Sequence, residues 1–110
     1  MLKDLMKEIV KFRDDRNWSQ YHNAKDLAIS LSLEAAELLE NFQWLDNEKA
    51  VNKNIENIKD ELADIIIYSL LMSDRLNLDL EKIIRNKLQK NIAKYPVEKA
   101  YGSNKKYDEL

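Results

Sequence analysis

The sequence predicts an all-α fold, a four-helix bundle, from three observations. The 110-residue chain contains one Gly and one Pro, which leaves little material for tight turns. Leu, Ile, Lys, Glu, Asp and Asn dominate its composition, a balance that favours helices joined by short polar connections. Apolar residues recur at steps of three and four in four segments, the period of helices with one buried face. A chain of this length builds one packed core.

The first helix is expected over residues 2–15, where Leu2, Leu5 and Ile9 form an apolar face. Arg13 and residues 16–22 follow as a stretch that has no helical period and combines aromatic with polar side chains. It is interpreted as a loop whose side chains suit stacking and hydrogen bonding, or as a connector that plugs the end of the bundle.

The second helix is expected to begin after Asn23, because this side chain can cap it together with Asp26. The polar stretch 46–54 that follows it either forms a loop or begins the central helix early. The apolar stripe predicted to be buried on the second helix consists of Leu27, Leu31, Ala35, Leu38 and Phe42.

The central helix places acids where a core helix is expected to be apolar. The seam predicted to be its core face consists of Ile58, Leu62, Ile65, Ser69, Met72 and Leu76. A parallel stripe combines two carboxylates with an aromatic residue and a cation: Glu61, Asp64, Tyr68, Leu71 and Arg75. Because carboxylates are rarely buried unpaired, this stripe is expected to meet cations.

The fourth helix can be capped by Asn77 or Asp79 and is expected to stop before Pro96, because the residue preceding a proline disfavours the α region. The predicted domain covers residues 1–95. Residues 96–110 are predicted to be an irregular basic tail of the same domain.

Charge is distributed unevenly along the chain. Residues 82–110 contain eight Lys or Arg and three acids, a net charge of +5, so residues 1–81 carry −7 of the total of −2. The basic end is either a solvated helix face or a phosphate-binding arm, and the acidic remainder disfavours a long nucleic acid as partner. With no Cys and no apolar run near the roughly 20 residues that span a bilayer, we expect a cytoplasmic protein that does not bind membranes.

Two acid pairs are the strongest candidates for a functional site: Glu34 with Glu37, and Glu61 with Asp64. A spacing of three residues places each pair on adjacent turns of one helix face, and facing pairs would offer a cluster of oxygen ligands. Such ligands suit Mg²⁺ or Mn²⁺, whereas the single His and the lack of Cys exclude multi-histidine and thiolate centres. The alternative is that these acids are ordinary solvated helix charges.

Beyond the acid pairs, the chain carries several motifs in a fixed order. They are Arg16-Asn17-Trp18-Ser19-Gln20-Tyr21-His22, Glu34-x-x-Glu37 with Phe42-Gln43-Trp44, Glu61-x-x-Asp64-x-x-x-Tyr68, Asp74-Arg75, Lys87-x-x-x-Asn91-x-x-Lys94-Tyr95-Pro96 and Lys106-Tyr107. Together they resemble the MazG-like family of all-α nucleoside triphosphate pyrophosphohydrolases, most closely its dCTP pyrophosphatase branch. The chain departs from the family at Leu33 and Ala36, where Gly is common.

The resemblance implies cleavage of a nucleoside triphosphate between its α- and β-phosphates, in an active site built between the subunits of a homodimer or homotetramer. It implies that the catalytic magnesium ligands are Glu34, Glu37, Glu61 and Asp64. The implied phosphate-binding residues are Lys87, Asn91, Lys94 and Tyr95, with Lys25 and Arg75 as further candidates. The implied base and sugar pocket contains Trp18, His22, Trp44 and Tyr68. The alternative function is a non-catalytic nucleotide-sensing or structural helical-bundle oligomer, which the four intact acidic positions disfavour.

Overall fold

The computed structural model describes residues 1–110, and every regular element in it is helical. The elements are α1 (Leu2–Asp15), a 3-10 turn (Ser19–Tyr21), α2 (Ala24–Glu40), α3 (Asn47–Arg75), α4 (Leu80–Lys94), α5 (Val97–Ala100) and a second 3-10 turn (Tyr107–Glu109). The all-α prediction is confirmed. No helix combines the length and apolar character that crossing a bilayer requires.

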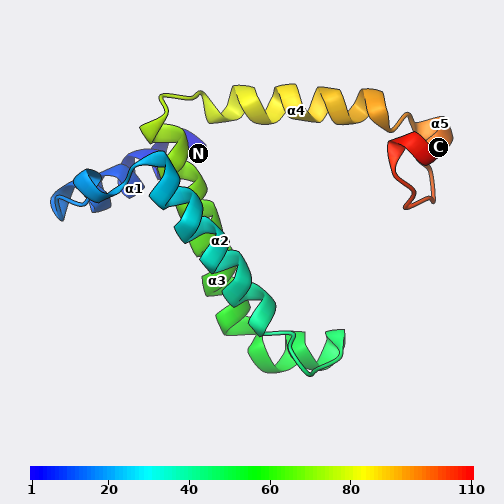
Figure 1. The fold of residues 1–110 in the computed structure, drawn as a ribbon, viewed down its shortest axis with the longest axis horizontal. Coiled ribbons are helices and arrows are strands. Elements are labelled where there is room, and N and C mark those ends of the chain that lie inside the picture. The colour runs from blue at the N-terminus through cyan, green and yellow to red at the C-terminus, as the bar shows by residue number, and fades with distance from the viewer. The chain divides into compact units, whose positions relative to one another are not determined.

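The chain divides into two compact units, Met1–Leu78 and Asp79–Leu110. In the first unit α2 and α3 run antiparallel, side by side, and α1 lies across the C-terminal part of α3 (Figure 1). The second unit contains α4, α5 and the final 3-10 turn. The domain boundary expected after residue 95 stays a prediction.

The helix ends follow the local signals in the sequence. The Asn23 side chain caps α2 by accepting a hydrogen bond of 2.8 Å from the backbone N–H of Asp26. The side chain of Asp79 caps α4, and α4 ends at Lys94, before Pro96. These caps satisfy backbone N–H groups that a helix leaves without internal partners. The predicted start of α2 and both predicted ends of α4 are confirmed, whereas α2 ends at Glu40, a few residues before the expected end at residues 42–44.

Replacing Asn23 by Ala is expected to lower the free energy of unfolding by about 1 kcal/mol, because the first turn of α2 loses its side-chain acceptor. Urea denaturation measures the loss. Asn23→Ser keeps an acceptor at the same position without placing a second carboxylate beside Asp26, and it is expected to unfold at nearly the wild-type midpoint. Equal losses in the two variants would show that the cap does not stabilise the protein.

The buried face of α3 differs from the predicted seam. Leu62 and Leu76 are half exposed, at 52% and 47%, whereas Leu70 and Leu71 are buried. The predicted core face is therefore wrong at these two leucines. The reason is tertiary: α1 packs over the C-terminal part of α3, where Leu71 shares a cavity wall with Ile9, so the inward face is rotated towards the carboxylate stripe.

An asparagine cluster joins the end of α2 to α3. Asn54 has non-helical dihedral angles (φ −113°, ψ 17°) inside α3, and its side-chain N–H donates to the backbone carbonyl of Asn41 at 2.7 Å. Asn57 donates to the side-chain oxygen of Asn41 at 2.8 Å. The central helix thus begins early, at Asn47, and is kinked at Asn54.

Candidate metal centre and adjoining pocket

Three carboxylates from two helices meet in the first unit. Glu34 on α2 and Glu61 and Asp64 on α3 each offer one oxygen, and these oxygens all lie within 4.8 Å of one another. All three residues are half-buried. The helical spacing of three places Glu61 and Asp64 on one face of α3. The antiparallel pairing of α2 and α3 brings Glu34 against that face.

When the acids are ionised, two oxygens in this cluster have no hydrogen-bond donor within the chain. The Oε2 atoms of Glu34 and Glu61 are buried and accept no hydrogen bond. None of the ion pairs in the structure involves these residues or Asp64. Because a buried carboxylate without a partner is costly, the arrangement fits a cation. Oxygen-only ligands suit Mg²⁺, Mn²⁺ or Ca²⁺.

The closeness of these acids raises the pKa values of Glu34 and Glu61. The pKa of Glu34 is raised from 4.5 to about 7, first by its hydrogen bond with Glu61, then by burial and by the nearby Glu37 carboxyl. At Glu61 the hydrogen bond with Glu34 lowers the pKa, but burial and the charges of Glu37 and Asp64 outweigh it, so the pKa rises. In the metal-free protein the cluster therefore retains a proton that a divalent cation would displace.

A pH dependence of stability follows. Since the pKa of Glu34 is about 7 in the folded protein and 4.5 ordinarily, the folded state binds more protons between these values. The stability that this proton confers is full below pH 4.5 and is lost as the pH rises through 7. Denaturation in EDTA between pH 5 and pH 8 is expected to show that decline. The decline should flatten in Glu34→Gln and persist in Glu40→Gln, a control on the exposed side of α2. An unchanged slope in Glu34→Gln would contradict this assignment.

Glu37 lies near the other three acids but is more exposed than they are. It lies one turn beyond Glu34 on α2 and is exposed, and its carboxylate is not among those that converge within 4.8 Å. Its charge nevertheless contributes to the raised pKa values of Glu34 and Glu61. It is therefore close enough to act electrostatically on the cluster.

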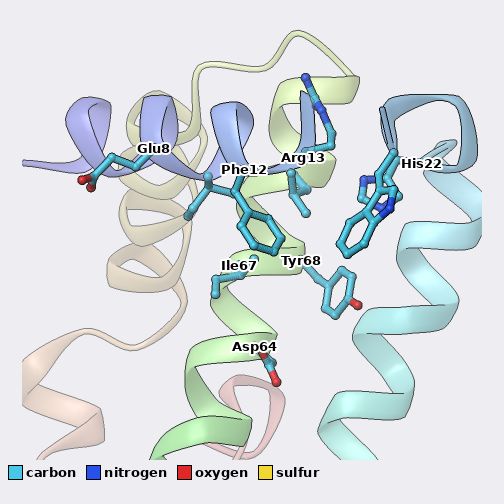
Figure 2. Close-up of a pocket in the computed structure, with 10 residues that line it drawn as sticks. Glu8, Phe12, Arg13, His22, Asp64, Ile67 and Tyr68 are labelled. Atoms are coloured by element: carbon cyan, nitrogen blue, oxygen red, sulfur yellow. The ribbon is translucent and has the colours of Figure 1, made fainter. Parts of the chain in front are cut away.

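A pocket of about 440 Å³ adjoins the cluster and shares Asp64 with it. Figure 2 shows Phe12 on α1 and Tyr68 on α3 facing this space, with His22 beside it and Asp64 one helical turn from Tyr68. Its complete lining is Glu8, Ile9, Phe12, Arg13, Trp18, His22, Asp64, Ile67, Tyr68 and Leu71. Aromatic walls next to a carboxylate cluster suit a ligand with a flat ring and an anionic end.

Two polar side chains of the pocket, His22 and Tyr68, are uncharged at neutral pH. Burial, followed by the positive charge of Arg13, lowers the pKa of His22, and its Nδ1 atom is buried without a hydrogen-bond partner. Burial raises the pKa of Tyr68, and the charges of Glu34 and Asp64 add to the rise. At neutral pH the pocket therefore presents a neutral imidazole and a phenol, both able to donate or accept a hydrogen bond.

The structure brings some of the predicted ligand-binding residues together. Trp18, His22 and Tyr68 line the pocket. Trp44 does not: it lies in the turn after α2 with φ 67° and is 91% exposed. The 17 residues of α2, about 25 Å of helix, separate this turn from His22.

The remaining candidates for phosphate binding lie on exposed or separate elements. Lys25 is exposed in the first turn of α2, and Arg75 is exposed at the end of α3. In the second unit Lys94 and Tyr95 pack against Tyr107, with ring centroids 6.3 Å apart for the two tyrosines and the Lys94 Nζ atom 4.8 Å from the Tyr107 ring. Lys87 and Asn91 lie on α4, and steps of four and three place them on the same face as Lys94.

Sequence reasoning missed the part of the pocket that α1 supplies. Phe12 and Arg13 line the cavity, and Arg13 is buried. One signal in the sequence could have identified the contribution of Arg13. Arg13 follows the apolar Ile9 by four residues, so both residues lie on the inward face of α1. A buried cation on that face requires an acidic partner, which the structure supplies in Asp74.

The fold and site define a class: all-helical proteins in which carboxylates from two helices form a candidate cation centre beside an aromatic pocket. The chain belongs to the MazG-like family, whose model matches residues 29–110. It is 31% identical to dCTP pyrophosphatase 1 of Rattus norvegicus over 114 residues and 32% identical to that of Homo sapiens, covering 99% of this chain and 67% of each relative. Among solved structures it resembles a pyrophosphatase from Archaeoglobus fulgidus DSM 4304, with a TM-score of 0.80 and 36% identity over 86% of this chain and 91% of that one.

Proposed function

We propose that this protein is a Mg²⁺-dependent pyrophosphohydrolase of nucleoside triphosphates. It would cleave a dCTP-like or base-modified (deoxy)nucleoside triphosphate between the α- and β-phosphates, releasing the monophosphate and pyrophosphate. The observation that carries the proposal is the convergence of Glu34, Glu61 and Asp64 within 4.8 Å at the edge of an aromatic pocket. Membership of the MazG-like family and the names of its relatives support the reaction class.

The acids of the centre have a clear chemical task. Glu34, Glu61 and Asp64, with Glu37 close by, would hold Mg²⁺ or Mn²⁺, which when bound neutralises phosphate oxygens and lowers the pKa of a water molecule. A water molecule would attack the α-phosphorus, and the bond from this phosphorus to the bridging oxygen would break. Pyrophosphate would leave, and a carboxylate oxygen of the acid cluster would take up the proton of the water.

The pocket would orient the base and sugar. Trp18 and Tyr68 offer ring faces for stacking, and His22 offers an uncharged polar edge. Trp44 is distant from this pocket in its own chain and would complete it in a homodimer or homotetramer. The cationic and polar groups proposed to bind the phosphates are Lys87, Asn91, Lys94 and Tyr95, with Lys25 and Arg75 in supporting positions.

A product analysis tests this function. The protein is incubated with Mg²⁺ and a panel of normal and base-modified triphosphates, and the products are separated chromatographically. Monophosphate and pyrophosphate are expected in equal amounts, and EDTA should stop their release. Accumulation of diphosphate with inorganic phosphate would place the cleavage at the wrong bond and refute the proposed reaction.

A further inference from the structure

We infer that the ion pair between Arg13 and Asp74 is a positioning device, which fixes the aromatic wall of the pocket relative to the carboxylate centre. This inference deepens the proposed function and rests on it, because the wall is assigned there to the nucleotide base. The two residues lie 61 positions apart, on α1 and α3, and the pair ties these helices together.

The geometry of Arg13 marks it as more than a surface charge. Its Nη1 atom donates to Oδ2 of Asp74 at 2.8 Å, and its Nε atom donates to Oδ1 of Asp14 at 2.9 Å. The arginine side chain is only 9% exposed, and that of Asp74 is 36% exposed. A buried guanidinium is retained at low cost only where such partners hold it in place, so the pair constrains both helices.

The last turn of α1 transmits this constraint to the aromatic wall. The backbone carbonyl of Arg13 accepts a hydrogen bond from the N–H of Trp18 at 3.1 Å. Phe12 meets Trp18 edge to face with ring centroids 5.6 Å apart, and the Arg16 guanidinium lies 3.9 Å from the centre of the Phe12 ring. Phe12 and Trp18 therefore form one packed unit attached to Arg13.

At its other end the pair is attached to the helix of the carboxylate centre. Asp74 lies ten residues, about 15 Å, beyond Asp64 on the same α3, and Tyr68 lies between them. Because α3 is continuous over that length, a shift of Asp74 would also move Tyr68 and Asp64. In Figure 2 the nitrogen end of Arg13 points away from Phe12 and Tyr68, so the guanidinium acts on the wall rather than on a ligand between them.

The kinetic test uses Asp74→Asn, which keeps the size of the side chain and removes its charge. The KM for the best triphosphate is expected to rise about tenfold while kcat changes little, an effect within the range of coupled contacts. Asp74→Glu restores the carboxylate and should restore most of the KM. The matched control is Asp15→Asn, which removes the exposed pair with Lys11 on the same α1 and should leave KM unchanged.

A second readout does not depend on activity. In a Trp44→Phe background Trp18 is the only tryptophan, so its fluorescence reports on the wall alone. Adding Asp74→Asn is expected to increase acrylamide quenching of Trp18, whereas calorimetric binding of Mg²⁺ alone should not change. Adding Arg13→Lys, which keeps the charge but loses the second donor, should increase quenching as well.

The two readouts separate this inference from the proposed function. Increased quenching in these variants, together with a wild-type protein that hydrolyses no triphosphate, would support the positioning role and refute the enzymatic proposal. Unchanged quenching and unchanged KM in both Asp74→Asn and Arg13→Lys would overturn the positioning role, whatever the activity. Far-UV circular dichroism checks that each variant is folded. If either Asp74→Asn or Arg13→Lys does not fold, the result for the variant that does fold tests the positioning role.

Discussion

Asp64→Asn and Glu61→Gln are each expected to abolish Mg²⁺-dependent release of pyrophosphate, lowering kcat at least about 100-fold. Each substitution replaces one carboxylate oxygen of the converging group by an NH₂ group and removes the negative charge that the side chain offers to the cation. A bound metal ion contributes several kcal/mol of transition-state stabilisation, and each 1.4 kcal/mol lost is about a factor of ten in rate. Steady-state assays of pyrophosphate over a range of Mg²⁺ concentrations measure the effect.

Two nearby acids provide matched controls. Asp60 is exposed and adjacent to Glu61 on α3, and Glu40 is exposed one turn beyond Glu37 on α2. Asp60→Asn and Glu40→Gln remove the same charge without touching the cluster, so both should retain near wild-type activity. Calorimetry with Mg²⁺ should show weakened binding only in the cluster variants. Full turnover in Asp64→Asn and Glu61→Gln alike would refute the assigned centre.

Leu70→Ala is expected to destabilise the first unit by about 2–5 kcal/mol, because a side chain that is 1% exposed leaves a cavity when it is truncated. Leu70 lies on α3 two residues after Tyr68, so it helps to hold the segment that carries both the carboxylates and the pocket wall. Urea unfolding at a fixed protein concentration measures the loss. The control is Leu39→Ala on α2, where the leucine is 70% exposed and little apolar area is lost. A loss as large in Leu39→Ala would show that burial within the chain does not explain the effect.

The helices and their ends could be predicted because their signals are local. Asn23 and Asp79 cap the helices that follow them, and Pro96 lies just beyond the end of α4. Each of these preferences depends on a few neighbouring residues. The inward face of α3 depends instead on α1, which is distant in sequence, so the period alone placed Leu62 and Leu76 in the core.

The candidate site divides in the same way. The helical spacing of Glu61 and Asp64 was enough to predict that they share a face, and an excess of acids beside apolar residues suggested a cation. That Glu34 would meet them depended on how α2 and α3 pair. The contribution of Phe12 and Arg13 was missed because α1 reaches the pocket by crossing α3, and the reaction itself was suggested by the family resemblance rather than by spacing.

The kink at Asn54 decides where the chain tolerates a change of length. Each residue inserted into a continuous helix turns everything beyond it by about 100°. At Asn54 the helical path is already broken, and the hydrogen bond to the carbonyl of Asn41 anchors the break to α2. Additions within residues 47–53 can therefore be absorbed before the break, whereas one residue added between the kink and Glu61 would rotate both acids of α3 away from Glu34. The direction in which Glu61 and Asp64 point therefore depends on the number of residues between them and the kink at Asn54, and not on their distance from the start of the helix.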